Sequence, residues 1–399
     1  MRRQVMATLF VTVAIVTAGC GAGSGDTEVA PAPADPNAPA TGTLKLFTYG
    51  DTVADQMIQP FEKANPDLNL EIATFDSNKA AAAKLAGGFE ADVVEVCTDE
   101  MEPLLARGLL RPLDEKAVPA FHELAFADAP EVRDDAGNVL FVPASAGPQG
   151  LIVNTDQVDP ADVKSWTDLF DDAYAGNAAL EATPLTALGA AALALGLDDP
   201  MNLSDDQVEE AKQYLLDHRD NFRAFADSDA SMVNLFKSGE VVIADGGRGT
   251  TQAMIDDGVP VEWIAPEEGA MSWVCGLAIT SKAQNIDAAY KLINYYASPE
   301  AQAISGDMGF VAMNPKALPM VSSAFRKSAD PRNLDDAIPQ TEPDNADVYE
   351  RAWQEVQAQE PPPHRRRPAV GQRRRSSGRS PTGSGAASPA SPGGCWSRS

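Results

Sequence analysis

The stretch LKLFTYGDTVADQMIQPFEKANPDLNLEIATF, residues 44–75, decides the fold class. Apolar and polar residues alternate at its start, which predicts a strand with one buried face, and its last eight positions predict a second strand. Between these strands, apolar residues recur at helical spacing. Asp51 or Thr52 is the expected N-cap of the helix, and Pro66 follows its expected end. We therefore predict a strand, a helix and a strand in succession.

The same alternation continues downstream. NKAAAAKLAGG (78–88) predicts a helix that ends at glycines, ADVVEV (91–96) predicts a strand, and MEPLLARGLL (101–110) predicts another helix. Strands that alternate with helices favour a parallel sheet covered by helices, which is an α/β fold. In such sheets ligands bind beyond the carboxyl ends of the strands. Those ends are residues 48–52, 76–78 and 97–100.

A second block of elements begins at VLFVPASAGPQGLIVNTDQV (139–158), which runs through glycines and prolines. Near its end, WVCGLAIT (273–280) predicts an apolar strand that carries a thiol. The body of the chain, about 43–358, has roughly the length of two domains. The whole chain has a formal net charge of −27, which is compatible with solubility and with attraction of cations.

The N-terminus indicates an exported protein. Two arginines, an apolar run over 5–16 and small residues before Cys20 have the order of a secretory signal, and the run is too short for a comfortable membrane span. A short membrane anchor is the alternative. The residues around Cys20 resemble the bacterial lipoprotein processing box, in which the cysteine becomes the lipid-modified first residue. We expect a signal peptide over 1–20, lipidation of Cys20, a disordered Gly/Ala/Pro-rich tether over 21–42, and anchorage to the outer face of the cytoplasmic membrane.

The C-terminal residues 359–399 reverse the charge of the chain. They contain eight of the 31 basic residues and one acidic residue, so they carry +7 while the rest of the chain carries −34. Arg, Ser, Pro and Gly dominate them, as in a disordered interaction tail. A frameshifted reading of GC-rich DNA is the alternative, because the segment contains no lysine. Neither interpretation supports nucleic-acid binding, and we predict none.

The order of segments resembles that of the extracellular solute-binding proteins of ATP-binding-cassette (ABC) importers, specifically the branch that binds the polyamines spermidine and putrescine. The segments that carry this resemblance run in family order over about 43–320. They are LFTYG (46–50), FEKANPDLNLEI (61–72), ADVVEV (91–96), GLIVNTDQVDP (150–160), SWTDLFDDAYAGN (165–177), FKSGEVVIADG (236–246), VEWIAPEEGAMSWVCGLAI (261–279), AAYKLINYYASPEAQ (288–302) and GFVAMNPKAL (309–318).

The resemblance implies a two-lobed, type II periplasmic-binding-protein fold with a hinge and a ligand cleft between the lobes. It places residues 43–145 and 275–320 in lobe 1 and residues 146–274 in lobe 2. We expect residues 321–358 to form a helical segment that packs on the lobes. The implied function is transport and not catalysis: a monomer captures a small-molecule ligand in the periplasmic space and delivers it to the permease subunits in the membrane.

The resemblance also implies ligand-binding residues. Aromatic faces that match cleft positions of the polyamine binders come from Tyr49, Trp273 and Phe310. The family's key amine-pairing carboxylate, two positions after the tryptophan, is replaced by Cys275, and a further pair of acids expected at 183–186 is absent.

An unpaired buried ammonium is unfavourable by several kcal/mol, so the loss of the central carboxylate argues against a copy of spermidine recognition, and an amine ligand would need other acids in its place. The candidates are Asp51, Asp99 and Asp245, with Thr98 beside them, and the implied ligand is a small organic cation such as a polyamine. Each acid has another interpretation: Asp51 as a helix cap, and Asp99 and Asp245 as solvated loop acids.

The two cysteines of the body also follow from the family's sheet order. Cys97 ends the third strand, and Cys275 begins a strand that this order places beside it in the opposite direction. Two adjacent thiols outside the cytoplasm are expected to oxidise, so we predict a Cys97–Cys275 disulfide. Two buried, unpaired cysteines are the alternative.

Two other functions are compatible with parts of the sequence. Arg248, before a predicted helix, could bind a small carboxylate or amino acid, although a surface arginine is the simpler interpretation. Thiaminase-like enzymes resemble the same fold and use a cleft cysteine, for which Cys97 with Asp99 or Glu100 as base is the candidate. A disulfide would block that nucleophile. The three histidines are scattered, and no zinc spacing, P-loop or dinucleotide fingerprint occurs, so we predict neither metal nor cofactor.

Overall fold

The structure is a computed structural model that describes residues 28–359 except 76, 100 and 135. The predictions for the signal peptide, for Cys20 and for the basic tail lie outside these residues, as does the candidate base Glu100.

The first part of the chain forms the alternating strands and helices that the sequence predicts. Its elements are β1 (Gly42–Thr48), α1 (Asp55–Ala64), β2 (Leu68–Thr74), α2 (Asn78–Ala86), β3 (Val93–Cys97), α3 (Glu102–Leu105), β4 (Leu110–Arg111) and the long β5 (Val142–Asn154).

The middle of the chain forms a second set of elements, and the last part returns to the first set. The second set is β6 (Ala178–Glu181), α4 (Pro184–Leu195), α5 (Asp205–Asp217), β7 (Phe222–Ala226), α6 (Asp229–Ser238), β8 (Ile243–Gly247), α7 (Arg248–Asp256), β9 (Val261–Ile264) and the long β10 (Met271–Thr280). The last part is α8 (Ile286–Tyr296), α9 (Pro299–Asp307), β11 (Ile338–Pro339) and α10 (Ala346–Gln357).

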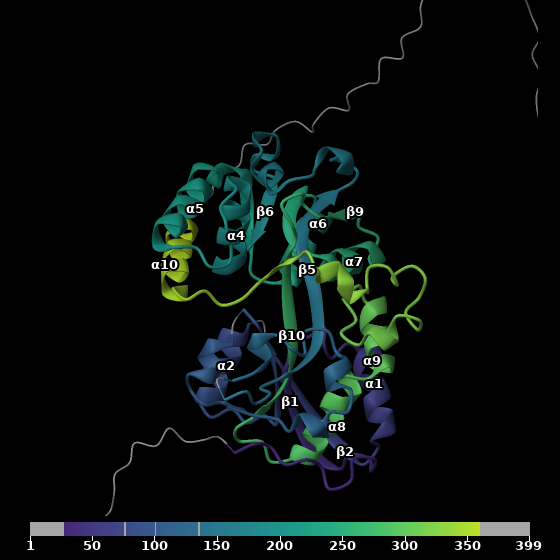
Figure 1. Ribbon diagram of the computed structural model, residues 1–399. Helices are drawn as coiled ribbons and strands as arrows, with labels where there is room; N and C mark the ends of the chain where they lie inside the picture. The colour runs from purple at the N-terminus through teal and green to yellow at the C-terminus, as the bar shows by residue number, and fades with distance from the viewer. Residues whose placement is uncertain (1–27, 76, 100, 135, 360–399) are drawn as a thin grey trace, which may run out of the picture. The chain divides into compact units, whose positions relative to one another are not determined.

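The strands follow the same plan twice. In lobe 1 the order is β2-β1-β3-β10-β4, with β10 antiparallel to β3 and β4. In lobe 2 it is β7-β6-β8-β5-β9, with β5 antiparallel to β8 and β9. The antiparallel strand of each lobe is therefore one of the two strands that connect the lobes: β10 in lobe 1 and β5 in lobe 2. The strands β5 and β10 pair with each other, and Figure 1 shows them running side by side from one lobe into the other.

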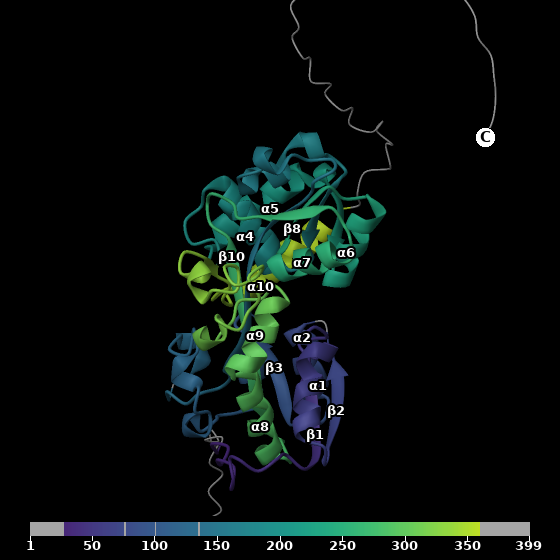
Figure 2. The same ribbon diagram turned by 90° about the vertical axis from the view of Figure 1, so that its right-hand side faces the viewer.

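The described residues form four hydrophobic clusters, and the two largest, one in each lobe, support the division into lobes. On β5, Ala146 belongs to the first core and Leu151 to the second, and on β10 the change falls between Met271 and Val274. The helices α8 and α9 lie beside the lobe 1 strands (Figure 2), whereas α10 lies with α4 and α5 in lobe 2 (Figure 1). The segment after lobe 1 thus ends in a helix that contributes Trp353 to the core of lobe 2.

The start of α1 differs from the prediction. The helix begins at Asp55 with Ala54 at its N-cap position, so neither Asp51 nor Thr52 caps it. Asp51 Oδ1 instead accepts a hydrogen bond from the backbone N–H of Thr52, at 2.9 Å. Residues 49–54 therefore form a connection between β1 and α1, which removes the helix-cap interpretation of Asp51.

The segment before β1 also differs from the expected disordered tether. Ala30 is buried, its N–H donates to Pro112 O at 2.8 Å, and its carbonyl accepts from the Tyr290 hydroxyl at 2.9 Å. Ala40 N–H donates to Asn65 Oδ1 at 2.7 Å. Backbone groups of this segment form hydrogen bonds with lobe 1. The composition of the segment, which has few large apolar residues, does not reveal these bonds. The part of the tether from Ala30 onward is therefore held against the folded body.

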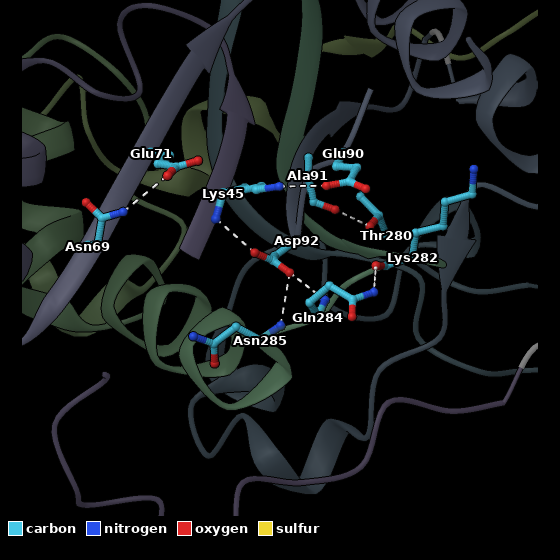
Figure 3. Close-up of polar contacts among 10 residues, drawn as sticks. All are labelled: Lys45, Asn69, Glu71, Glu90, Ala91, Asp92, Thr280, Lys282, Gln284 and Asn285. Carbon is cyan, nitrogen blue, oxygen red and sulfur yellow. Dashed lines mark hydrogen bonds and ion pairs between the residues drawn. The ribbon is translucent and has the colours of Figure 1, made fainter. Parts of the chain in front are cut away.

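A buried acid fastens the amino end of β3 to the start of α8 (Figure 3). The Asp92 carboxylate accepts from the backbone N–H groups of Lys45 at 2.8 Å, Gln284 at 2.6 Å and Asn285 at 3.0 Å. Asp92 lies at the opposite end of β3 from Cys97, so its role is structural.

Among the helices of the described residues, none has both the length and the apolar character needed to cross a membrane.

Candidate functional site

The parallel strands of both lobes end beside β5 and β10, the two crossover strands that connect the lobes. These strand ends lie close to each other. Cys97, the last residue of β3, pairs with Cys275 on β10. Gly247, the last residue of β8, pairs with Gln149 on β5, which itself pairs with Met271. Only a short stretch of β10 separates the two strand ends, so side chains from both lobes converge there.

The predicted disulfide between Cys97 and Cys275 is confirmed. The two residues are direct register partners with a Cα–Cα distance of 4.0 Å, both are buried, and their sulfur atoms are bonded. A cysteine in a disulfide offers no thiolate, so Cys97 in this form cannot act as the nucleophile of a thiaminase-like reaction.

The structure brings two of the three predicted aromatic residues together. The rings of Trp273 and Phe310 lie edge to face with centroids 5.9 Å apart. The indole of Trp273 also covers Gly147, where a Cβ atom would lie 2.8 Å from the ring. Tyr49 packs edge to face against Phe75, with centroids 4.6 Å apart. All three predicted aromatics are partly exposed.

The acid predicted on a loop of lobe 2 lies inside a strand instead. Asp245 is part of β8, which lies between β5 and β6 in the sheet, and its side chain is fully buried. Its Oδ1 accepts from the Glu181 N–H at 2.8 Å, and Gln149 Nε2 lies 3.5 Å from its Oδ2. Burial raises the pKa of Asp245 to about 7. The solvated-loop interpretation of Asp245 is therefore wrong.

Glu181, at the end of β6, joins Asp245 in a carboxyl pair that the sequence analysis missed. Burial, followed by the charges of Asp245 and Asp229, raises the pKa of Glu181 well above its ordinary value. The family's second pair of acids was expected at 183–186. In the structure Thr183 is instead the N-cap of α4, and Pro184 is the first residue of that helix. The sequence did offer a sign of this acid, because Glu181 is the last residue of the strand that precedes α4.

Glu95 is the second acid that the sequence analysis missed, and it lies in the middle of β3. It is 2% exposed, and its Oε2 accepts from the hydroxyls of Thr48 and Thr52 and from the Tyr49 N–H at 3.2 Å. Burial, then the charge of Asp51, raises the pKa of Glu95 to about 7. An ionisable residue within the apolar run VVEVC was the sign of an unusual environment.

Acids of the two lobes face each other. The pKa of Asp51 in lobe 1 is raised by desolvation and by the charge of Asp229 in lobe 2, although both side chains reach solvent. The charge of Asp99 in lobe 1 contributes to the raised pKa of Glu181 in lobe 2. Asp229, the first residue of α6, is a further acid that the sequence analysis did not single out. We call these six residues the acid cluster: Asp51, Glu95, Asp99, Glu181, Asp229 and Asp245.

Arg248 does not neutralise this cluster. Its guanidinium donates to the Ser328 carbonyl and lies 5.7 Å from the centroid of the Trp263 ring. Burial lowers the pKa of Arg248 to about 10. Within the described part of the chain, Arg248 forms no ion pair with an acid.

Thr98 takes part in a third connection between the lobes. Its hydroxyl donates to the carbonyl of Gln340 at 2.9 Å, and Gln340 Nε2 donates to Thr186 Oγ1 at 3.0 Å. The N–H of Gln340 donates to Ser272 O on β10 at 2.7 Å. Gln340 thus bridges the strand end of lobe 1 and the first turn of α4 in lobe 2.

Carboxyl groups gathered in this way, with raised pKa values, are suited to bind a cation. Deprotonation of one of them is unfavourable unless a positive charge compensates it. In the described residues, no group of three or more metal-ligating side chains is arranged to hold a metal ion. The aromatic faces of Trp273 and Phe310 suit an organic cation.

Comparisons with known proteins agree with this geometry. The family model described as bacterial extracellular solute-binding protein matches residues 56–331. The chain is 28% identical over 291 residues to the spermidine/putrescine-binding periplasmic protein 1 of Haemophilus influenzae, covering 71% of this chain and 79% of the relative. It is 28% identical over 346 residues to the putrescine-binding periplasmic protein PotF of Escherichia coli, covering 79% of this chain and 91% of the relative.

Among solved structures, the chain is similar to the spermidine/putrescine ABC transporter substrate-binding protein PotD of Streptococcus pneumoniae. The TM-score is 0.67 at 21% identity, and the match covers 79% of this chain and 99% of the other. At that identity the similarity concerns the fold, and it confirms the predicted two-lobed, type II architecture.

Proposed function

Because the chain belongs to the family of bacterial extracellular solute-binding proteins, we propose that it is the substrate-binding subunit of an ABC importer for a small organic cation. A polyamine or a related amine is the ligand class that the site supports best. Two of the similar proteins are named for the binding of putrescine, alone or with spermidine. Solute binding is the function of the family, whereas the choice of a cation is our proposal.

The acid cluster is the observation that carries the choice of a cation. Glu95 and Asp245 are buried, both have pKa values of about 7, and neither has a basic partner among the described residues. A ligand that brings two positive charges would compensate carboxylates of both lobes at once. Because interactions of this kind are strong away from water, they can supply both affinity and selectivity.

The aromatic residues and the crossover strands complete the proposed site. Trp273 and Phe310 offer ring faces to the alkyl chain and to the ammonium groups of the ligand. Two strands, β5 and β10, and the bridge through Gln340 connect the lobes, so they would form the hinge. Binding of a cation would relieve the repulsion between the acids of the two lobes and favour their closure.

The delivery route is part of the same proposal. Export, lipidation of Cys20 and anchorage to the outer face of the cytoplasmic membrane would keep a monomeric binding protein beside its permease. The order of charged, apolar and small residues before Cys20 supports this route.

A small carboxylate or amino acid held by Arg248 is the alternative ligand. The contacts of Arg248 with Ser328 and Trp263 make this choice weaker, because one terminal nitrogen of the guanidinium already donates to Ser328, although its buried Nε has no partner among the described residues. The surrounding acids would also repel an anion.

A thermal-shift screen of the purified protein against amines, amino acids and organic acids tests the proposal. A ligand present at a hundred times its Kd stabilises the folded state by about 2.7 kcal/mol, which is readily measured. We expect stabilisation by diamines or polyamines. Stabilisation by organic acids with none by any amine would contradict the proposal and favour Arg248.

A further inference from the structure

A small cavity lies in lobe 1 beside the acid cluster. Its lining includes Asp51, Thr52, Glu95, Ser145, Tyr296 and Phe310. The free volume of about 20 Å³ admits about one group of the size of a water molecule. A whole polyamine cannot enter such a space, but one end of a linear amine can.

Among the described residues that line this cavity, Glu95 is the only acid with a buried side chain. The side-chain hydrogen bonds that Glu95 accepts from described residues come from Thr48, Tyr49 and Thr52, and all of them go to the single oxygen Oε2. The other oxygen, Oε1, accepts no hydrogen bond from any residue between 28 and 359 that the structure describes. A buried carboxyl with a vacant acceptor therefore lines a cavity of the size of one polar group.

A β-bulge in the crossover strands helps to form the cavity. The register between β10 and β5 shifts after Cys275, which pairs with Ser145, so that Gly276 pairs with Pro143 and Ala144 is left over. A Cβ atom at Gly276 would lie 2.3 Å from the Val142 carbonyl oxygen, so this close approach requires glycine. Both Ala144 and Ser145 line the cavity.

The position of Glu95 relates the cavity to the disulfide. Glu95 lies two residues before Cys97 on β3, so the two side chains are on the same face of the strand. Cys97 in turn pairs with Cys275, and Cys275 pairs with Ser145 of the cavity wall. An acid is therefore available close to position 275, which itself carries sulfur and no charge.

We propose that this cavity binds one unsubstituted primary ammonium group of the ligand, with the Glu95 carboxylate as its counter-charge. The proposal rests on the amine-binding function above and narrows it to linear amines with at least one primary ammonium end. Such a group carries three N–H donors, which match Glu95 Oε1 and the oxygens of Asp51 and Ser145 at the cavity wall. An ammonium with methyl substituents is larger than the cavity and lacks two of these donors.

Isothermal titration calorimetry of the full-length protein with two probes tests the proposal. Putrescine has two primary ammonium ends, and N,N,N′,N′-tetramethylputrescine has the same spacing and charge with both ends blocked. We expect wild type to bind putrescine at least about tenfold more tightly than the methylated probe, as for the loss of charge-assisted hydrogen bonds.

Two substitutions separate a role in binding from a role in folding. Glu95→Gln keeps the shape of the side chain and removes the charge, and Ser145→Val fills the cavity and keeps every acid. Each should weaken putrescine binding by about tenfold or more and change binding of the methylated probe little, so the preference for primary ends is lost. Glu71→Gln, an exposed acid on β2, is the matched control and should leave both affinities unchanged.

The outcomes distinguish this proposal from the proposed function. If wild type binds both probes equally, or if Glu95→Gln and Ser145→Val keep the preference for putrescine, the cavity does not hold an ammonium group although amine binding stands. If wild type binds no amine at all, both the proposed function and the ammonium cavity are overturned.

Discussion

Asp51 of lobe 1 and Asp229 of lobe 2 lie close enough for the charge of Asp229 to raise the pKa of Asp51. A second pair, Asp99 and Glu181, crosses between the lobes in the same way. Like charges on facing surfaces oppose each other unless a cation lies between them. We therefore expect the charge of the ligand to be the main determinant of recognition in the proposed site.

The first prediction concerns Asp245, the fully buried acid of lobe 2. Asp245→Asn should weaken binding of putrescine and of its tetramethyl derivative alike, each by about 10- to 100-fold, since a buried charge contributes about 1.5–3 kcal/mol to such a contact. Calorimetric titration measures both affinities. Asp67→Asn, on the exposed turn before β2, is the control that should change neither. Unchanged affinity in Asp245→Asn would remove the lobe 2 acids from the site.

The second prediction is a dependence of binding on pH. The pKa values of Glu95 and Asp245 are about 7, and those of Asp51, Glu181 and Asp229 are also raised. A primary amine stays charged to a pH of about 10, so only the acids titrate near neutrality. Affinity for putrescine should therefore rise as the pH increases from about 6 to about 8.

Proton release gives an independent measurement of the same linkage. Binding at pH 7 should release protons, so the apparent binding enthalpy should differ between buffers with different ionisation enthalpies. Glu95→Gln should reduce the number of protons released. A binding enthalpy that is the same in all buffers would contradict the prediction.

The fold was predictable from two kinds of signal. The alternation over residues 44–75 is a local pattern that predicts a parallel sheet, whereas the resemblance of the segment order to that of solute-binding proteins implies which strands return to lobe 1. The Cys97–Cys275 pair followed from that order, since both residues lie at strand ends in the expected sheet.

The acid cluster was predictable only in part, for a physical reason. Asp51 and Asp99 follow strand ends, where ligand sites in α/β sheets are expected. Glu95 and Asp245 lie within strands, where a charged residue is unfavourable unless its face meets a site, and the sequence does not show which face does so. The contacts of Ala30 were equally hidden, because they involve backbone groups alone.

The third prediction concerns Arg248. Arg248→Ala should change putrescine affinity less than about threefold, because its guanidinium contacts Ser328 and Trp263 and no acid of the cluster. Thermal unfolding should show a modest loss of stability from the lost packing. A strong loss of binding to any organic acid that stabilises the wild type would instead support the alternative ligand class.

The fourth prediction is that the disulfide stabilises the protein. The bond joins residues 178 positions apart in sequence, and the chain-entropy account gives about 5 kcal/mol for closing a loop of this length. The double substitution Cys97→Ala and Cys275→Ala should lower the free energy of unfolding by about 2–5 kcal/mol, measured by urea denaturation of both proteins. Reduction of wild type with dithiothreitol should give a similar loss, whereas dithiothreitol should not affect the double variant.

The fifth prediction is that Glu95 makes the ligand-free protein less stable at high pH. Its folded-state pKa of about 7 lies above the ordinary value of 4.5, so its contribution to stability is fully present below pH 4.5 and is lost as the pH rises through about 7. At pH 8 this difference corresponds to at most about 3 kcal/mol. Glu95→Gln removes the titration, so the variant should be more stable than wild type at pH 8 and equally stable near pH 4.

Chemical denaturation at the two pH values measures this difference, with Glu71→Gln as the exposed control. Putrescine should reverse the order at pH 8, because it stabilises wild type through the Glu95 carboxylate and the variant less. A variant that is less stable than wild type at pH 8 without ligand would mean that the hydrogen bonds of Glu95 with Thr48 and Thr52 outweigh the unfavourable burial of its charge. In that case Glu95 would have a structural role in the ligand-free protein, and its role as counter-charge would be decided by the calorimetric comparison alone.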